Sequence, residues 1–399
     1  VSIAGKRHSM GGHTLSPNAL LLDMTQFNEV IDVDVENRTL RIQSGATWDD
    51  AIREVNKHDL AIPVLQDYSS FSIGGSLGVN IHESDPNFTT LIDTVRSFRI
   101  LLADGSIQTV SRTQNPNLFA LVIGGYGLFG VVLDVELDLV PNAVYKKNEW
   151  VVDYKEYEDA FKEIRKNAGI ENIFGRLSIV PGDSFLKDVV VTTYEALSEE
   201  ERETLSYRTD LVEDNVFLKK IFFDASREND LGKQLRWQPQ KNFSNGAEPP
   251  VVTRNNLDYN DASFLEYYGE KDTDILQEYF FPMDQLPAFL DSLREIMEEK
   301  KVNLLSATIR YVEGKSENIL SYSKNGEDRF AVVLYFNVGR SAEEQENVKA
   351  WTQELVQVSI DLGGTYYLPY ELYATGEQLV SAYPRISYFF NQKKRYDPN

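Results

Sequence analysis

Hydrophobic residues in the first part of the chain recur at every second position, in short runs that predict β-strands. The segment VIDVDVENRTLRIQ (30–43) alternates apolar and polar residues on both sides of Glu36–Asn37, which predicts a hairpin. VRSFRILLADGSIQTVS (95–111) predicts a second hairpin that turns at Asp104–Gly105. Between them, Thr47 precedes apolar residues at helical spacing. The pattern predicts a capped helix with one apolar face, formed by Trp48, Ile52 and Val55.

From about residue 143 the apolar spacing becomes helical over longer stretches. Residues 283–301 predict a helix with one apolar stripe, formed by Leu286, Phe289, Leu290, Leu293, Ile296 and Met297. NLLSATIRYV (303–312) and RFAVVLYFNV (329–338) predict strands, and Ser341 with Glu344 predicts a capping box that opens another long helix. This order predicts an α+β layer in which helices cover one face of an antiparallel sheet.

Composition narrows the class of protein. A chain of 399 residues exceeds what one hydrophobic core usually serves, so we expect two domains. The net charge of -22 argues against a nucleic-acid partner, which would repel the protein. Cysteine is absent, which excludes disulfides, thiolate catalysis and cysteine-bound metals, and the four histidines all precede residue 83.

Targeting signals are not visible in the sequence. No apolar run is long enough for a membrane span, and no signal peptide is recognisable. The first residues, VSIAG, read as the middle of a strand and do not begin with Met, so we expect the N-terminal part to be truncated. We expect a cytoplasmic, bacterial protein, with secretion left open by that truncation.

The segment GGYGLFG (124–130) formally contains the dinucleotide fingerprint of nicotinamide-binding folds. That fingerprint needs a strand before it and a helix after it, because the helix N-terminus binds the pyrophosphate. Here NPNLFALVI before it predicts a helix and VVLDVELDLV after it predicts a strand. The reversed order rejects a Rossmann fold. The glycines permit either a tight connection or a close approach of backbone to a ligand.

Three glycine-rich segments fall in the first 130 residues: AGKRHSMGGHT (4–14), SFSIGGSLGVNIHES (70–84) and GGYGLFG. Each joins predicted elements and exposes backbone N–H groups, which in a turn can bind an anion. One such loop is weak evidence. Three in one domain predict a single long ligand that contains a pyrophosphate.

Together these segments resemble the FAD domain of the vanillyl-alcohol oxidase flavoproteins, the PCMH-type FAD-binding oxidoreductases, and most closely that of the alditol and aldonolactone oxidases. GKRHSMGG matches the loop whose histidine is often bonded to the 8α-methyl group of FAD, with His8 at that position. The loop from Ser72 to His82 and the segment 124–130 match the second and third signatures. SGATWDDA (44–51) lies at the expected place between the first two.

The resemblance implies an α+β fold: a two-subdomain PCMH-type FAD-binding domain plus an α+β cap domain with an antiparallel sheet covered by helices. It implies an FAD-binding domain at 1–142, a substrate or cap domain at 143–375, and a return to the FAD domain at 376–399. The cofactor it implies is FAD, linked covalently through His8. The cofactor-binding residues it implies are Gly5, Lys6, Arg7, His8, Ser9, Met10, Gly11, Gly12, Ser72, Gly74, Gly75, Gly78, Val79, Asn80, His82, Gly124, Gly125, Gly127, Gly130 and Val131.

Some residues depart from the family pattern. Glu83 follows the histidine of the second loop, where these oxidases usually have glycine. On the strand that carries a Glu-x-Arg pair in alditol oxidase, this chain keeps Arg310 but has Thr308 at the carboxylate position. The late lysine motif of alditol oxidase is replaced by YYLPYEL (366–372). The polyol chemistry of that enzyme therefore does not transfer directly.

The candidate catalytic residues follow from these segments. The alternation in 303–312 places Leu304, Ser306, Thr308 and Arg310 on one strand face, which either faces solvent or lines a polar cavity, and the resemblance favours the cavity. With no histidine after residue 82, a tyrosine or Glu371 is the natural acceptor of a substrate proton. The catalytic set is Arg310, Tyr367, Tyr370, Glu371 and Thr308.

The first loop contains two histidines, and they have different interpretations. We expect His8 to contact the flavin and His13 to be a bystander. A metal site at His8 and His13 would need a third ligand that the spacing does not supply, so we expect no metal. His82 either donates to the flavin or is satisfied by a loop carbonyl.

The resemblance thus implies oxidation of a CH–OH group of a sugar, polyol or lactone-like substrate by hydride transfer to flavin N5. The expected partners are a small-molecule substrate and O2 or another electron acceptor. The alternatives are a flavoprotein of the same fold that acts on a lipid-linked sugar or as a reductase, and an FAD-binding protein without turnover.

Overall fold

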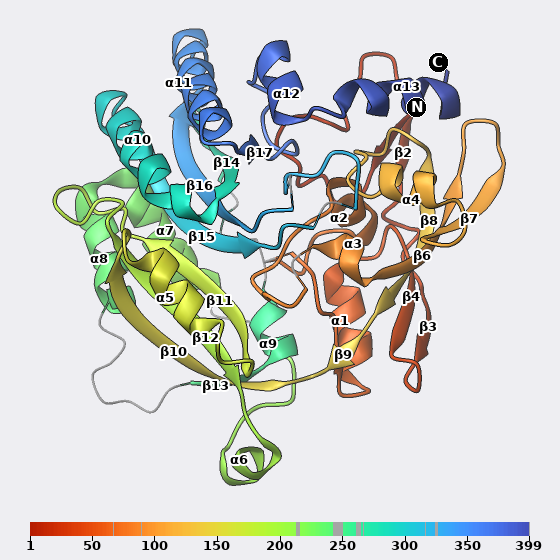
Figure 1. Cartoon of the computed structure of the whole chain (residues 1–399), viewed down its shortest axis with the longest axis horizontal. Helices are drawn as coiled ribbons and strands as arrows, with labels where there is room; N and C mark the ends of the chain where they lie inside the picture. Colours follow the sequence, from red (N-terminus) through yellow and green to blue (C-terminus); the bar gives the residue numbers. More distant parts are fainter. Residues whose placement is uncertain are drawn as a thin grey trace.

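The structure of the chain, a computed structural model, describes residues 1–66, 68–88, 90–212, 216–241, 250–260, 265, 267–315, 317–323 and 326–398. Its two main sheets are both antiparallel and lie on opposite sides of the molecule (Figure 1). Helices and strands are mixed throughout, so the fold class is α+β, as predicted. Where the FAD and cap domains begin and end stays a prediction.

The first 142 residues build the smaller sheet and the loops around it. In chain order their elements are β1 (Ser2–Ala4), β2 (Leu21–Asp23), β3 (Val30–Asp34), β4 (Thr39–Gln43), α1 (Trp48–Asn56), β5 (Leu60–Ala61), α2 (Ile73–Val79), α3 (Leu91–Thr94), β6 (Val95–Leu101), β7 (Ile107–Ser111), α4 (Pro116–Val122), β8 (Val131–Asp138) and β9 (Val140–Pro141). The five-stranded sheet has the order β3-β4-β8-β6-β7. The β3–β4 and β6–β7 pairs confirm both predicted hairpins.

Helix α1 starts where the sequence predicts. The Thr47 hydroxyl accepts a hydrogen bond from the Asp50 N–H, and the Asp50 carboxylate accepts one from the Thr47 N–H, which completes a capping box. Trp48 is fully buried and its indole N–H donates to Ser76 of α2 at 3.0 Å. The apolar face of α1 thereby supports the second glycine-rich loop from behind.

The remaining elements build the larger sheet and its helices. They are β10 (Val144–Asp153), α5 (Tyr157–Ile164), β11 (Ile170–Leu177), β12 (Asp188–Ala196), α6 (Glu199–Thr204), α7 (Val216–Glu228), α8 (Asp230–Lys241), β13 (Val251–Thr253), α9 (Arg254–Asp258), β14 (Asp272–Pro282), η2 (Met283–Gln285), α10 (Leu286–Glu299), β15 (Asn303–Val312), β16 (Arg329–Gly339), α11 (Ala342–Asp361), β17 (Thr365–Tyr366), α12 (Gly376–Ala382) and α13 (Ile386–Tyr396). The sheet order is β13-β10-β12-β11-β15-β16-β14-β17. The predicted strands at 303–312 and 329–338 and the capped helix after Ser341 are confirmed.

Three helices cover one face of this sheet, as predicted. Phe281 of β14 stacks on Phe289 of α10, and Phe336 of β16 packs against Trp351 of α11. Phe161 of α5 stacks on Tyr311 of β15. Because side chains alternate across a strand, the neighbours of these residues in sequence point to the other face, away from the three helices.

One residue of β15 departs from the predicted alternation. A bulge between Leu304 and Ser306 shifts the register, and Leu304 packs in the main hydrophobic core instead of lying on the face of Ser306 and Thr308. A β-bulge places one extra residue in one strand and so reverses the parity of the residues before it.

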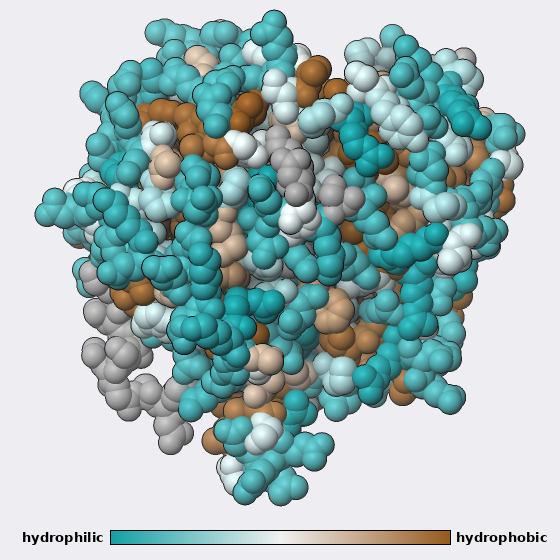
Figure 2. All heavy atoms as spheres, viewed as in Figure 1, coloured by the Kyte–Doolittle hydropathy of each residue, from teal (hydrophilic) through white to brown (hydrophobic). Residues whose placement is uncertain are grey.

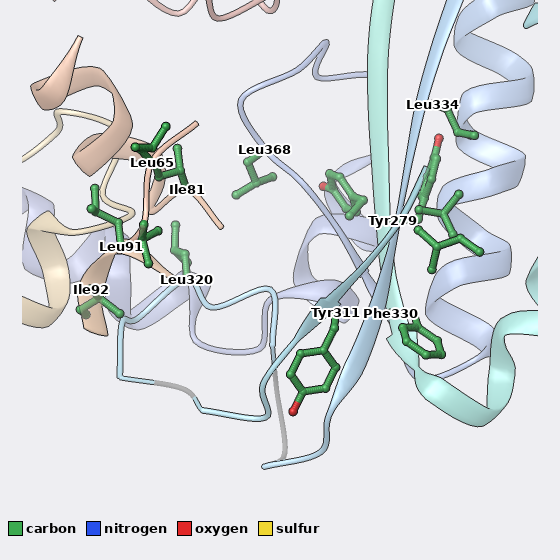
Figure 3. Close-up of a cluster of buried hydrophobic side chains, with 14 of the residues drawn as sticks. Leu65, Ile81, Leu91, Ile92, Tyr279, Tyr311, Leu320, Phe330, Leu334 and Leu368 are labelled. Carbon is green, nitrogen blue, oxygen red and sulfur yellow. The ribbon is translucent and has the colours of Figure 1, made fainter. Parts of the chain in front are cut away.

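A single hydrophobic cluster connects the two halves of the chain. Figure 3 shows Leu65, Ile81 and Leu91 of the first half at one end of this cluster and Phe330 of β16 at the other. The C-terminal helix α13 lies beside the N-terminus (Figure 1), and Phe389 packs edge-on against Phe129 with ring centroids 5.1 Å apart. Apolar packing therefore holds the two sheets together, and the C-terminal helix adds to it by packing against the first half of the chain.

The face drawn in Figure 2 is mostly hydrophilic, and its apolar residues form separate groups. Among the helices that the structure describes, none is both long enough and apolar enough to cross a membrane.

Candidate active site

A cavity of about 1150 Å³ lies where the glycine-rich loops meet the face of the larger sheet that points away from α5, α10 and α11. Its walls include the three glycine-rich segments, residues of α1, and residues of β14, β15 and β16. Eight tyrosines contribute to its lining: Tyr68, Tyr126, Tyr259, Tyr267, Tyr268, Tyr335, Tyr367 and Tyr370. The volume lies above the range of about 300–1,000 Å³ that is usual for small-molecule sites, so the cavity has room for a large ligand.

The first loop forms one wall of the cavity. Residues 5–10, which include His8, line it, whereas Gly11 and Gly12 do not. Arg7 has a left-handed backbone (φ 61°) and its guanidinium pairs with Asp23 at 3.2 Å. The His8 ring packs edge-on against Phe71 of the second loop, with centroids 4.2 Å apart. The structure therefore brings His8 into the cavity wall.

His13 also lines the cavity, although it was predicted to be a bystander. Its Nε2 lies 3.0 Å from the carbonyl oxygen of Leu368, so this nitrogen carries the proton. Burial lowers the pKa of His13, and the Leu368 carbonyl offsets part of that effect. The contact ties the first loop to the segment that follows β17.

The second loop contains helix α2 and forms the floor of the cavity. Ser72, Gly74, Gly75, Gly78, Val79 and His82 line it. Asn80 does not: it has a left-handed backbone (φ 49°), and its side chain accepts a hydrogen bond from the Ile92 N–H at 2.9 Å. Asn80 therefore fixes the turn that directs the chain to His82.

The third loop docks onto the second through backbone hydrogen bonds. The Gly124 N–H donates to the Leu77 carbonyl at 3.0 Å and the Tyr126 N–H donates to the Gly78 carbonyl at 2.8 Å. Gly127 and Gly130 line the cavity, whereas Gly124, Gly125 and Val131 do not. A Cβ on Gly125 would lie 2.1 Å from the Leu121 carbonyl oxygen. Both interpretations of the glycines thus hold: some permit the tight connection and others face the cavity.

The face of the larger sheet that points away from α5, α10 and α11 closes the cavity opposite the loops, and Phe223 of α7 packs against Tyr335 on this face. Asp274, Leu276 and Glu278 of β14, Val333 and Tyr335 of β16, and Arg310 of β15 line it. Thr308 pairs with Val333 and lies on the same face, but it does not line the cavity. Arg310 thus faces the cavity and not bulk solvent, while the role of either residue in catalysis stays a prediction.

The predicted tyrosine cluster is only partly in the cavity. Tyr367 and Tyr370 line it, but the Tyr367 hydroxyl donates to the Val79 carbonyl at 3.0 Å, and burial raises the pKa of Tyr367 well above its ordinary value. Glu371 does not line the cavity; partial burial raises its pKa. Of the predicted proton acceptors, Tyr370 lines the cavity, and its hydroxyl donates to the Glu278 carboxylate at 3.4 Å.

Glu278 is a charged cavity residue that no sequence motif predicted. Its Oε1 lies 2.6 Å from Nε2 of His82, and both side chains are almost fully buried. The rings of Phe280, Tyr322 and Tyr367 surround the imidazole at centroid distances of 5.5, 5.7 and 5.8 Å. A carboxylate within the apolar sequence LQEYFF was the available signal, because a buried charge in a strand needs a reason.

The cavity fits the FAD that the resemblance implies. A Cβ on Gly78 would lie 3.9 Å from the Gly127 nitrogen, and one on Gly127 would lie 3.8 Å from Ile3 Cδ1, so neither glycine is required by tight packing of the protein. His82 Nδ1 is buried and has no hydrogen-bond partner among the described residues. In the described part of the chain, no group of three metal-ligating side chains could hold a metal ion. A bound dinucleotide could accept hydrogen bonds from the backbone N–H groups of the glycine-rich loops and could provide a partner for His82 Nδ1.

Comparison with known proteins agrees with this geometry. A family profile described as an FAD binding domain matches residues 1–111. An uncharacterized oxidoreductase of the fasciation locus of Rhodococcoides fascians is 31% identical over 140 residues, which cover 35% of this chain and 32% of that protein. Decaprenylphosphoryl-beta-D-ribose oxidase of Mycolicibacterium smegmatis is 26% identical over 34% of this chain and 30% of that protein. L-gulonolactone oxidase of Mus musculus is 29% identical over 33% and 31%. The matched region spans about a third of the length of these relatives.

Proposed function

We propose that this chain, whose residues 1–111 match an FAD binding domain, is a PCMH-type FAD-dependent oxidoreductase that oxidises a CH–OH group of a sugar, polyol or lactone-like small molecule. The observation that carries the proposal is one cavity lined both by the glycine-rich loops of residues 1–130 and, on the opposite wall, by Arg310 of the larger sheet. Such a cavity holds cofactor and substrate next to each other, which is what hydride transfer needs.

The three loops would hold the cofactor. Residues 5–10, the α2 segment from Ser72 to Gly78, and Gly127 present backbone to the cavity, and His8 is the proposed site of a covalent linkage. When bound, FAD supplies the two-electron oxidation by accepting a hydride from the substrate. The protein contributes binding and orientation of both partners.

Arg310 would stabilise negative charge in the cavity. Its guanidinium is always charged, and it lies on the sheet face opposite the loops. As a substrate hydroxyl loses its proton, negative charge develops on oxygen, and a fixed cation there lowers the barrier. The tyrosine-rich lining suits a ligand with both ring surfaces and hydroxyl groups, since each tyrosine offers an apolar face and a polar tip.

The test is anaerobic mixing of the FAD-loaded protein with sorbitol, xylitol, glucose, ribose and gulonolactone. We expect at least one compound to bleach the flavin absorption band, and Arg310→Lys to slow the bleaching by about 100-fold. Arg165→Lys, at the exposed end of α5, is the matched control and should change the rate little. A band that persists with every compound would favour an FAD-binding protein without this activity.

A further inference from the structure

The cavity carboxylates differ in how fully they are engaged. Among the described residues, Asp49, Asp50, Asp274 and Glu278 line the cavity. Asp49 pairs with Arg53 at 2.8 Å, and Asp50 completes the α1 capping box. Asp274 receives Arg227 and also the Asn337 side chain at 2.8 Å. Each of these three therefore has a structural partner that accounts for its charge.

Glu278 has a different environment. Its Oε1 lies 2.6 Å from His82 Nε2, which is ion-pair distance, and both side chains are almost fully buried. The contact does not have hydrogen-bond geometry: among the described residues, Oε1 and the opposite imidazole nitrogen, Nδ1, accept or donate none. A buried pair with incomplete hydrogen bonding costs stability, so its presence in a cavity wall indicates a function.

The side chains around the pair leave Oε2 of Glu278 available for a hydrogen bond to a ligand. The hydroxyls of Tyr322 and Tyr367 next to His82 donate to the backbone carbonyls of Asn80 and Val79, at 2.7 and 3.0 Å. They therefore do not neutralise Glu278. Among the described residues, the Tyr370 hydroxyl donates to its Oε2 over a long 3.4 Å contact. Tyr370 lines the cavity, so Oε2 lies at the cavity side of the pair.

We propose that Glu278 accepts the hydroxyl proton of the substrate at Oε2, while His82 holds the carboxylate through Oε1. This inference rests on the proposed function. The substrate O–H bond breaks and its proton passes to Oε2; the C–H hydrogen leaves with its electron pair to the flavin, and a C=O bond forms. The substrate is oxidised by two electrons and the flavin is reduced by two. His82 is a positioning residue in this scheme, and Glu278 is the catalytic residue.

The experiment compares four variants in the FAD-loaded protein with whichever panel compound bleaches the wild type. We expect Glu278→Gln to slow bleaching by about 100-fold or more, since general-base catalysis contributes that much. Glu278→Asp should keep part of the rate because it retains a carboxylate. Glu278→Ala leaves a hole in which added formate, a free carboxylate, should restore the rate at least about tenfold. Sodium chloride at equal ionic strength should not.

Glu83→Gln is the matched control. Glu83 is a buried carboxylate next to His82 in sequence, its Oε1 accepts a hydrogen bond from the Ser84 N–H at 2.7 Å, and it does not line the cavity. We expect its bleaching rate to stay within about threefold of wild type. Flavin absorbance and circular dichroism of each variant establish that it folds and binds FAD.

Two results would overturn the assignment of Glu278. One is Glu278→Gln bleaching within about threefold of wild type. The other is a slow Glu278→Gln together with a Glu278→Ala that formate does not restore, because the effect would then be structural. If no panel compound bleaches the wild type, the proposed function itself fails and this inference fails with it. That failure is seen in the wild type alone, so the two are distinguishable.

Discussion

Glu278 of β14 and Thr308 of β15 pair with the same residue, Val333 of β16, from its two sides. Because adjacent strands lie about 4.8 Å apart, the two residues occupy one row of the sheet roughly 10 Å apart and point to the same face. The chain therefore lacks a carboxylate at Thr308 but has one in the same row, two strands away. Only Glu278 of the two lines the cavity.

This arrangement predicts that the Thr308 hydroxyl is dispensable. Thr308→Val removes the hydroxyl with little change in shape, and we expect flavin bleaching within about threefold of wild type. Stopped-flow absorbance under anaerobic conditions measures the rate. A loss of bleaching rate comparable to that of Glu278→Gln would instead mean that the Thr308 hydroxyl takes part in the reaction.

Local elements could be predicted from the sequence because their causes are local. The capping box of Thr47 and Asp50 and that of Ser341 and Glu344 each depend on residues three apart, and both are present. The α+β class follows from such elements and their order. The position of Leu304 was wrong because a bulge, which leaves no clear mark in the sequence, reversed the alternation.

The candidate site was predictable only where a motif carried it. The three loops were found from glycine spacing, and the cavity includes residues from each of them. Glu278 meets His82 only because β14 lies next to the second loop in space, and no pattern within either segment encodes that contact. The packing of elements far apart in the sequence determines this contact, so the contact could not be predicted from the sequence alone.

Gly78 provides a test of cofactor binding that is separate from stability. A Cβ there would meet nothing within 3.9 Å, and the residue lies inside α2 with an ordinary backbone, so Gly78→Ala should keep or raise the free energy of unfolding by up to about 1 kcal/mol. If FAD occupies the cavity, the added methyl group should weaken FAD binding, as measured by quenching of flavin fluorescence.

Gly74→Ala is the contrasting variant on the same helix. Its Cβ would lie 2.9 Å from Ser44 Cβ and 3.0 Å from the Ser44 carbonyl oxygen, so we expect a destabilisation of about 1–3 kcal/mol in chemical denaturation. Unchanged FAD affinity in Gly78→Ala, with the fold intact, would mean that the cofactor does not pass over α2 at this point.

The placement of His8 in the cavity wall predicts a covalent flavin. After acid precipitation of the wild type, we expect the yellow colour and a mass increase of one FAD to stay with the protein. His8→Ala should release the flavin in acid, because the alanine methyl group cannot form the linkage. The control is His13→Gln, which leaves His8 and its contact with Phe71 in place. Release of the flavin from the wild type would show that the cofactor is not covalently bound.

His13 predicts a specific pH dependence of stability. Burial lowers its pKa below the ordinary value of 6.5, so the folded protein binds the His13 proton more weakly than the unfolded chain does. Its contribution is therefore fully present above pH 6.5 and is lost as the pH falls through the lowered pKa. His13→Gln keeps a donor for the Leu368 carbonyl but cannot titrate, so the wild type should lose more stability than this variant as the pH falls below 6.5.

The measurement is the free energy of unfolding in urea at a series of pH values from 7.5 down to about 5, the range over which the contribution of His13 to stability should change. His58→Gln is the comparison variant, because it removes an imidazole just beyond the end of α1, at a residue that does not line the cavity. Its pH dependence shows how much of the difference is specific to His13. If His13→Gln and the wild type lose stability in parallel, the folded and unfolded states bind the His13 proton equally. Burial of His13 would then contribute nothing to the pH dependence of stability.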